Sequence, residues 1–393
     1  MTTAPASSTG SVHGSAAAGF EPLREILAAG LASGDDVGAA VAVVHDGTVV
    51  ADIWGGVADP ASGEPWQRDT VVNVFSVTKT VSALAALLLL DRGELDLDAP
   101  VAKYWPAFGA AGKDGVLVRH VLGHTSGVCG WQLPMTLEGI YDLEHSTELL
   151  AAQEPWWAAG DRSGYQALNF GHLLNPIVEK ITGHTLGRFV ADELAGPLDV
   201  EFTIGTAAEV DARAATVIPP DRSPGIDYSK IPKESVIRKT LLNPALDPRT
   251  VNTPEWRRAE IGAVNGHANA LAVATLQSVI SHGSSPDGRI TLAPQTVARV
   301  FEVQSDAVDR VLYAQARWGA GFMLGWPGDA DRDELPSDDG RVCWWVGWGG
   351  SFVLNDAARR LTVAYVTNRM AHEMIHTRRG MSYVSAAYRA LRP

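Results

Sequence analysis

Apolar and polar positions near the N-terminus predict a helix followed by a β-hairpin. Apolar residues recur at helical spacing over residues 20–32, which is typical of a helix with one buried face. Two β-rich runs follow at residues 37–44 and 48–54, and they flank Asp46-Gly47. Because Asp-Gly favours the two-residue turn that matches strand twist, these runs are expected to pair as antiparallel strands.

The C-terminal part of the chain repeats this β character. Residues 341–353 are aromatic and glycine-rich, and residues 361–367 alternate in the manner of a strand. The two runs flank a turn at residues 355–360, which predicts a second antiparallel hairpin. A helix is expected over about residues 380–391, at the end of the chain.

Between these two β-rich ends, the pattern is typical of a helical region. From Pro100 to about His282, helix-like segments alternate with proline- and glycine-rich loops. This order predicts an α/β (α+β) fold, in which an antiparallel sheet is flanked by helices and a mostly helical domain is inserted. The predicted limits are a disordered N-terminus at residues 1–18, a discontinuous α/β domain at residues 19–100 and 285–393, and a helical domain at residues 101–284.

Composition and charge restrict the possible partners. The chain has 393 residues, a net charge of −13 and no lysine- or arginine-rich block, which argues against nucleic acid or an anionic membrane as a partner. Residues 1–18 lack the basic start and apolar core of a secretory signal. The longest apolar run, residues 81–90, is too short to cross a bilayer. Two cysteines, Cys129 and Cys343, are too few for a disulfide framework, so we expect a cytoplasmic protein. The oligomeric state is left open.

The stretch F-S-V-T-K-T-V places Ser76 and Lys79 three residues apart at the start of an apolar helix, which is expected to end near Arg92-Gly93. Residues i and i+3 share a helix face, so the lysine amine can reach the serine hydroxyl. Burial lowers the pKa of an amine, and a neutral amine can take the hydroxyl proton. At the surface the same pair would be a capping serine and a solvated lysine. The apolar residues on both sides favour the buried pair, which is a known nucleophile–base signature.

Two further motifs follow in order. Tyr165 lies in G-Y-Q-A-L-N-F-G after a polar loop, and Trp348-Gly349-Gly350 lies in the late β-rich run. Together with S-x-x-K, this order resembles the serine β-lactamase/penicillin-binding superfamily, and within it the class C-like family VIII carboxylesterases. The resemblance spans roughly residues 20–391 and implies a β-lactamase-like fold. It includes the segments R-G-E-L-D-L-D-A-P-V, V-R-H-V-L-G-H-T-S-G-V and R-L-T-V-A-Y-V-T-N.

The resemblance implies a role for the tyrosine. Tyr165 is expected to face Ser76 and Lys79 from the helical domain, to pass a proton to the leaving alcohol and then to help activate water. A cationic lysine nearby would ease deprotonation of the phenol. The alternative is a buried tyrosine without a catalytic part. The sequence departs from the family pattern at Ala167, where β-lactamases of this class carry Asn, and Asn169 is a candidate replacement.

The resemblance also implies a binding role for the late glycine-rich motif. Gly349 and Gly350 would let a substrate approach the strand backbone, and the N–H groups of Ser351 and Ser76 are expected to form the oxyanion hole. Trp348 stands where β-lactamases carry Lys or His. Without that cation to bind a carboxylate, uncharged esters are favoured over β-lactams. Further tryptophans are candidates for the pocket wall: Trp344, Trp345, Trp156 and Trp157.

We therefore predict a serine carboxylesterase that hydrolyses short uncharged carboxylic esters through an acyl-Ser76 intermediate, without a metal or organic cofactor. The alternatives within the superfamily are a β-lactamase, an amidase or peptidase, and an acyltransferase. A non-catalytic binding protein of the same fold is a further alternative. A zinc peptidase is more distant: His372 and His376 match H-E-x-x-H. Only 17 residues follow His376, and none is His, Asp, Glu or Cys, so a third zinc ligand would have to come from upstream.

Overall fold

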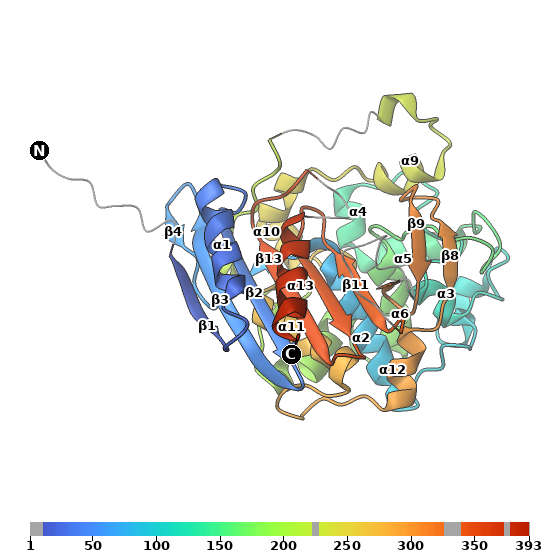
Figure 1. The fold of residues 1–393 in the computed structure, drawn as a ribbon. Coiled ribbons are helices and arrows are strands. Elements are labelled where there is room, and N and C mark those ends of the chain that lie inside the picture. The colour runs from blue at the N-terminus through green and yellow to red at the C-terminus, as the bar shows by residue number, and fades with distance from the viewer. Residues whose placement is uncertain (1–10, 222–227, 326–338, 373–377, 393) are drawn as a thin grey trace, which may run out of the picture.

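The computed structural model describes residues 11–221, 228–325, 339–372 and 378–392. Within these ranges, both ends of the chain contribute to one ten-stranded sheet, and its neighbouring strands are antiparallel (Figure 1). Across the sheet the strands are β1 (Val12–Ala16), β3 (Thr48–Asp59), β2 (Gly38–His45), β13 (Leu361–Thr367), β12 (Phe352–Asp356), β11 (Val342–Val346), β10 (Met323–Leu324), β9 (Gln315–Trp318) and β8 (Ser305–Val308), with β4 (Glu64–Pro65) paired to β3.

Helices cover both faces of this sheet (Figure 1). α1 (Pro22–Ser33) and α13 (Arg378–Ala390) contact each other and pack on one face. α11 (Ala270–His282) packs on the other face against β2 and β13, and nearly all of its residues are buried. A helix that is apolar on all sides is expected to lie between two layers in this way.

The remaining helices gather beside the sheet, which confirms the helical character predicted for the middle of the chain. A small second sheet has the order β5 (Val72–Asn73), β7 (His267–Ala268) and β6 (Phe202–Thr203). The helices of this region are α2 (Thr78–Asp91), α3 (Val118–Leu122), α4 (Leu137–Tyr141), α5 (Leu143–Ala152), α6 (Phe170–Thr182), α7 (Leu186–Val190), α8 (Gly196–Leu198), α9 (Val236–Leu241), α10 (Pro254–Arg258) and α12 (Pro294–Val300).

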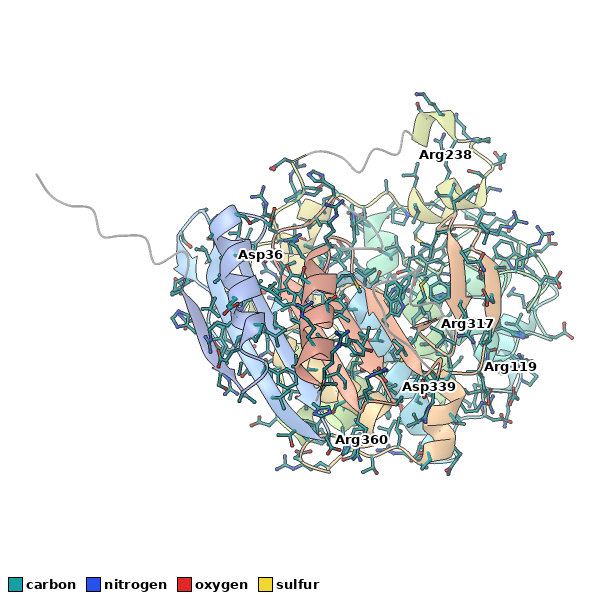
Figure 2. The ribbon with its side chains drawn as sticks, viewed as in Figure 1. Asp36, Arg119, Arg238, Arg317, Asp339 and Arg360 are labelled. Atoms are coloured by element: carbon teal, nitrogen blue, oxygen red, sulfur yellow. The ribbon has the colours of Figure 1, made fainter. Side chains whose placement is uncertain are left out.

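Both predicted hairpins are present. Asp46 and Gly47 have φ angles of 50° and 74°, as the two-residue turn between β2 and β3 requires. β12 pairs with β13, and Asp356 lies opposite Leu361. The turns of the two hairpins meet at the lower end of the sheet in Figure 2, where Arg360 Nε lies 2.9 Å from Asp46 Oδ1.

The run predicted as one strand at residues 341–353 is two strands, β11 and β12. The Gly347 N–H donates to the Ser351 carbonyl at 2.6 Å and closes the turn between them. Gly349 and Gly350 have φ angles of 99° and 116°. These angles suit glycine and interrupt a strand, so the glycine pair reverses the chain instead of continuing it.

The N-terminal segment differs from its prediction. The sequence predicts disorder for residues 1–18. Residues 1–10 lie outside the described residues, but in the rest of this range Val12–Ala16 forms β1 and pairs with β3. Its side chains are mostly exposed, so the strand has no apolar pattern by which the sequence could reveal it. Main-chain pairing along the edge of β3 is open to almost any side chain.

The predicted domain limits place α11 in the helical domain, because residues 101–284 were assigned to it. In the structure α11 packs directly on the sheet. An apolar helix shows in its sequence that it is buried, but not which layer covers it. The other limits stay a prediction.

The 3₁₀ turn Phe75–Val77 contacts β11 and leads into α2. The start of α2 therefore lies where the sheet meets the helical region. On the opposite side of the sheet, the buried Asp36 accepts hydrogen bonds from Tyr365 and Arg379 at 2.5 and 2.8 Å (Figure 2), which ties α13 to the sheet. Within the described residues, no helix combines the length and the apolar composition needed to cross a membrane.

Candidate active site

Ser76 lies in a strained turn at the start of α2. Phe75, directly before it, has a φ of 46°, which is uncommon for a bulky residue and costs about 1–3 kcal/mol. Asn73 Oδ1 accepts from the Phe75 N–H at 3.3 Å, and the Thr78 hydroxyl donates to the Phe75 carbonyl at 2.5 Å. These bonds on both sides hold the strained residue and fix the direction of Ser76.

Lys79 is 1% exposed and points at Ser76. Its Nζ lies 3.2 Å from Ser76 Oγ, 2.8 Å from the Ala167 carbonyl and 2.9 Å from the Ala263 carbonyl. Burial holds the pKa of Lys79 well below its ordinary value. A neutral amine has two N–H groups and one lone pair. The two carbonyls take the two N–H groups, so the lone pair is left for the Ser76 hydroxyl.

Tyr165 reaches Ser76 from the helical region. Its hydroxyl donates to Ser76 Oγ at 2.7 Å, and Trp345 Nε1 lies 3.2 Å from the same phenol oxygen. Burial raises the pKa of Tyr165, while its hydrogen bonds with Ser76 and Trp345 act against this rise. Burial therefore opposes the deprotonation of Tyr165 that was expected from nearby Lys79, and the phenol keeps its proton.

These contacts form a hydrogen-bond chain with one direction. An indole N–H can only donate, so Trp345 donates to Tyr165. The phenol proton is then directed to Ser76 Oγ. Ser76 Oγ in turn lies 3.2 Å from Lys79 Nζ, and a neutral Lys79 can accept the Ser76 proton over this contact. The resting site thus places the serine proton on the path to its base.

The sequence interpretation gave the main role to Trp348 and named Trp345 only as a candidate for the pocket wall, whereas in the structure Trp345 contacts the phenol. The Trp348 ring is half-buried and packs edge-on against Phe75, with 5.7 Å between the ring centroids. Both tryptophans therefore lie near the nucleophile, but Trp345 makes the polar contact. The run of aromatic residues on β11 was the available signal, and only the strand register selects among them.

The glycine-rich turn meets the Ser76 segment at its N-terminal end. A Cβ on Gly347 would lie 2.3 Å from the Val74 carbonyl oxygen, so the two backbones are in close contact. Ser351 lies across the turn, and its Oγ accepts from the Thr367 N–H at 3.2 Å. Gly349 contacts Met370, where a Cβ would meet the Met370 side chain at 2.6 Å. The predicted residues therefore lie in one turn, and this turn meets the Ser76 segment through Gly347, which contacts Val74, and through Trp348, which packs against Phe75.

The candidate replacement at Asn169 does not take the place of the missing asparagine. The side chain of Asn169 is buried, and its Nδ2 donates to the Val128 carbonyl at 3.1 Å. Lys79 is instead held by the main-chain carbonyl of Ala167. A carbonyl is available from any residue, so the family asparagine is not needed to orient the amine.

Two of the tryptophans predicted for the pocket wall lie beside the segment that leads into Tyr165. Trp156 and Trp157 contact each other, with 6.5 Å between their ring centroids. The Trp157 ring packs over Gly164, where a Cβ would lie 2.6 Å from the indole. Trp344 is buried beside Trp345 on β11.

The zinc motif can be followed only in part, because His376 lies outside the described residues. In the part of the chain that the structure describes, no three His, Cys, Asp or Glu side chains are grouped as metal ligands. His124 lies in a turn with a φ of 57° and packs against Tyr165.

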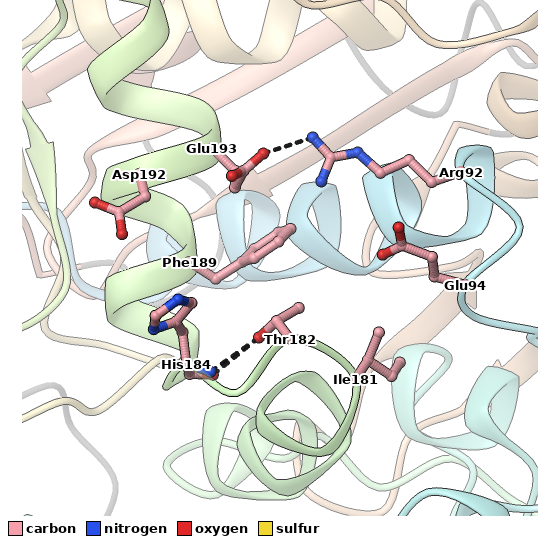
Figure 3. Close-up of a pocket in the computed structure, with 8 residues that line it drawn as sticks. All are labelled: Arg92, Glu94, Ile181, Thr182, His184, Phe189, Asp192 and Glu193. Atoms are coloured by element: carbon pink, nitrogen blue, oxygen red, sulfur yellow. Dashed lines mark hydrogen bonds and ion pairs between the residues drawn. The ribbon is translucent and has the colours of Figure 1, made fainter.

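A pocket of about 380 Å³ lies at the other end of α2 (Figure 3). Arg92 and Glu193 form an ion pair at 2.6 Å on its wall, and the His184 N–H donates to Thr182. None of the predicted site residues lines it. The complete lining is Arg92, Glu94, Ile181, Thr182, His184, Phe189, Asp192 and Glu193.

Comparison with known proteins shows the family and the fold of the chain. The family model described as Beta-lactamase matches residues 23–387. The chain is 32% identical over 349 residues to Esterase/beta-lactamase LipL of Mycobacterium tuberculosis, which covers 86% of this chain and 79% of that protein. It is 36% identical over 179 residues to Esterase EstB of Burkholderia gladioli, which covers 41% of this chain and 45% of that protein.

Solved structures show the same likeness. A crystal structure of a family VIII carboxylesterase is 31% identical, with a TM-score of 0.89, and covers 97% of this chain and 100% of that one. EstA from Arthrobacter nitroguajacolicus is 26% identical, with a TM-score of 0.84, and covers 96% and 98%. The match extends over nearly the whole chain, so the protein belongs to the beta-lactamase family, has its α/β fold, and resembles hydrolases of the family VIII esterase type.

Proposed function

We propose that the protein is a serine carboxylesterase that hydrolyses short uncharged carboxylic esters through an acyl-Ser76 intermediate. The observation that carries this proposal is the hydrogen-bond chain from Trp345 through Tyr165 and Ser76 to Lys79. A buried amine with a lowered pKa next to a serine hydroxyl is a nucleophile with its base in place.

Acylation follows from this arrangement. Ser76 Oγ attacks the ester carbonyl carbon while Lys79 takes the hydroxyl proton. The bond to the alcohol oxygen then breaks, and Tyr165 gives that oxygen its proton. The Lys79 ammonium returns a proton to the phenolate, which leaves an acyl-Ser76 ester and a neutral amine.

Deacylation uses the same groups in the same roles. Water attacks the acyl carbonyl and gives a proton to Lys79. The bond to Ser76 Oγ breaks as Tyr165 gives a proton to that oxygen, and the acid is released. The Lys79 ammonium then returns a proton to the phenolate, which restores the resting site. During both steps, the oxyanion is stabilised by the Ser76 N–H and by a main-chain N–H of the 347–351 turn. The close contact of Gly347 with Val74 favours Trp348 over the predicted Ser351 as the second donor.

A preference for uncharged esters is supported by Trp348, which stands where β-lactamases carry Lys or His, and by the neutral indole of Trp345 beside the phenol. A cation at this point would attract the carboxylate of a β-lactam, whereas an indole offers one N–H that is already engaged by Tyr165. The names of LipL and EstB support ester hydrolysis. A direct comparison of p-nitrophenyl butyrate with a chromogenic cephalosporin tests the preference, and faster cephalosporin hydrolysis would reverse it.

The covalent step has its own test. Intact-mass analysis after reaction with a fluorophosphonate, followed by peptide mapping, is expected to place one adduct on Ser76. The matched Ser76→Ala variant is expected to gain no mass and to lose hydrolysis. Adduct formation at another residue would refute the assignment.

β-Lactam hydrolysis is a second candidate, because the name of LipL includes beta-lactamase at 32% identity over 86% of this chain. An acyltransferase would reveal itself if transfer to an added alcohol exceeded hydrolysis. A zinc peptidase based on His372 would lose its activity to a chelator and keep it in Ser76→Ala.

A further inference from the structure

Asp309 is a buried carboxylate that joins the sheet edge to the candidate catalytic tyrosine. It follows β8 and is 1% exposed. Its Oδ1 accepts from the main-chain N–H of Tyr165 at 3.1 Å, of Val311 at 2.8 Å and of Leu312 at 3.0 Å. An ionised carboxylate only accepts hydrogen bonds, so it suits a position surrounded by donors.

The second oxygen of Asp309 holds an aromatic ring behind the tyrosine. Oδ2 accepts from Trp318 Nε1 at 3.2 Å. The Trp318 ring is parallel to the Tyr165 ring within 3°, with 6.0 Å between the centroids, and it also contacts Trp345 at 4.9 Å. One carboxylate therefore fixes both the main chain of Tyr165 and the ring that supports it.

The charge of Asp309 also acts on the phenol. Among the described residues, no ion pair neutralises this carboxylate. Burial raises the pKa of Tyr165, and the negative charge of Asp309 acts in the same direction. Geometry and charge thus favour the same state, a protonated phenol directed at Ser76.

We propose that Asp309 is a positioning residue for Tyr165, which it holds in place as the proton donor to the leaving alcohol. This inference rests on the proposed function, in which Tyr165 is that donor. Asp309 does not touch the substrate. It acts through the Tyr165 main chain and through Trp318.

A leaving-group comparison in Asp309→Asn tests this role. Ethoxide needs a proton to leave, whereas nitrophenolate leaves without one, so a displaced Tyr165 slows an ethyl ester more than a nitrophenyl ester. The kcat/KM values of ethyl butyrate and p-nitrophenyl butyrate are measured on protein whose active sites are counted by fluorophosphonate labelling. General acid catalysis is worth about 10²- to 10⁴-fold. Asp309→Asn is expected to lose part of this rate enhancement. Its kcat/KM for ethyl butyrate is expected to fall about tenfold further than its kcat/KM for p-nitrophenyl butyrate.

Asp356→Asn is the matched control. Asp356 is equally buried and also holds several donors, including the Tyr388 hydroxyl at 2.7 Å. Loss of the Asp356 carboxylate is expected to reduce stability and to leave the ratio of kcat/KM for the two esters unchanged. If Asp309→Asn yields no folded protein, Trp318→Phe removes one of the four bonds to Asp309 and keeps the charge. Trp318→Phe is expected to shift the ratio of the two kcat/KM values in the same direction as Asp309→Asn, but by a smaller factor.

The outcomes separate this inference from the proposed function. If Tyr165→Phe left the ratio of the two kcat/KM values unchanged, Tyr165 would not be the proton donor. This result would overturn both the proposed role of Tyr165 and the positioning role of Asp309. A raised ratio in Tyr165→Phe with a wild-type ratio in the folded Asp309→Asn or Trp318→Phe variant would overturn the role of Asp309 alone.

Discussion

Two buried lysines, Lys79 in the candidate active site and Lys113 in the helical region, have similar surroundings and different chemistry. Both side chains are almost fully buried and are held by main-chain carbonyl groups. Lys113 donates to the carbonyls of Ala110, Ala151 and Gln153. Three carbonyls match the three N–H groups of an ammonium ion.

Lys79 differs in its third partner. It has two carbonyls and the hydroxyl of Ser76, which can itself donate a proton. Burial lowers the pKa of both amines, but nearby Glu154 acts to raise that of Lys113, and the pKa of Lys79 is lowered further. The comparison teaches that burial alone does not distinguish the two lysines; in the proposed function, Lys79 is the base because its third partner is a hydroxyl that can give up its proton.

The largest expected effect is the loss of activity in Lys79→Met. Methionine keeps the apolar chain and removes the base, so kcat/KM for p-nitrophenyl butyrate is expected to fall by about 10³-fold or more. Lys113→Met is the matched variant, and its activity per labelled active site is expected to stay near that of the wild type. Equal losses in the two variants would show that the comparison is wrong.

The Lys113→Met variant is expected to lose stability although it keeps its activity. Lys113→Met leaves three buried carbonyls without their donor, and each unsatisfied group costs about 1–3 kcal/mol. We expect a loss of about 2 kcal/mol or more in the free energy of unfolding, measured by urea denaturation. A variant as stable as the wild type would mean that water reaches these carbonyls.

The pH dependence of stability should separate Lys79 from the other groups. Its pKa is lower in the folded protein than the ordinary value of 10.5. Between the lowered pKa and 10.5, the unfolded chain therefore binds more protons, and stability rises with pH by up to about 1.4 kcal/mol per pH unit. The difference between wild type and Lys79→Met in urea unfolding at several pH values should show this slope, and a constant difference would contradict a neutral Lys79.

The smallest effect is expected for Trp345→Phe, which removes the donor at the start of the hydrogen-bond chain. The loss of one buried hydrogen bond is worth about 1 kcal/mol, or several-fold in kcat/KM. Trp256→Phe is the control, because Trp256 is buried against Tyr141 in the helical region. If Trp345→Phe and Trp256→Phe lost the same amount of activity, the loss would be due to altered side-chain packing and not to the missing hydrogen bond.

Much of the fold and part of the site follow from local sequence. Asp46-Gly47 predicts its hairpin because the turn needs positive φ at both residues. Ser76 and Lys79 meet because helical spacing brings residues i and i+3 together. The apolar residues around them already predicted that the amine would be buried.

Other features have no local signal. β1 was missed because edge pairing uses main-chain groups that every residue has. The choice of Trp345 over Trp348 depends on the register of β11, and the sequence showed only that several tryptophans were close by. The role of Asp309 has no signal in the local sequence, because its contact with Tyr165 joins segments 144 residues apart.

The sequence by itself determined that a serine and a lysine share one face of a buried helix and that a tyrosine follows in the helical region. The tertiary structure decided which groups surround that site and hydrogen-bond to it. It did so because the groups responsible, the carbonyls of Ala167 and Ala263, the indole of Trp345 and the carboxylate of Asp309, come from distant segments. Their positions depend on how those segments pack, and main-chain carbonyls in particular leave no mark on an amino-acid sequence.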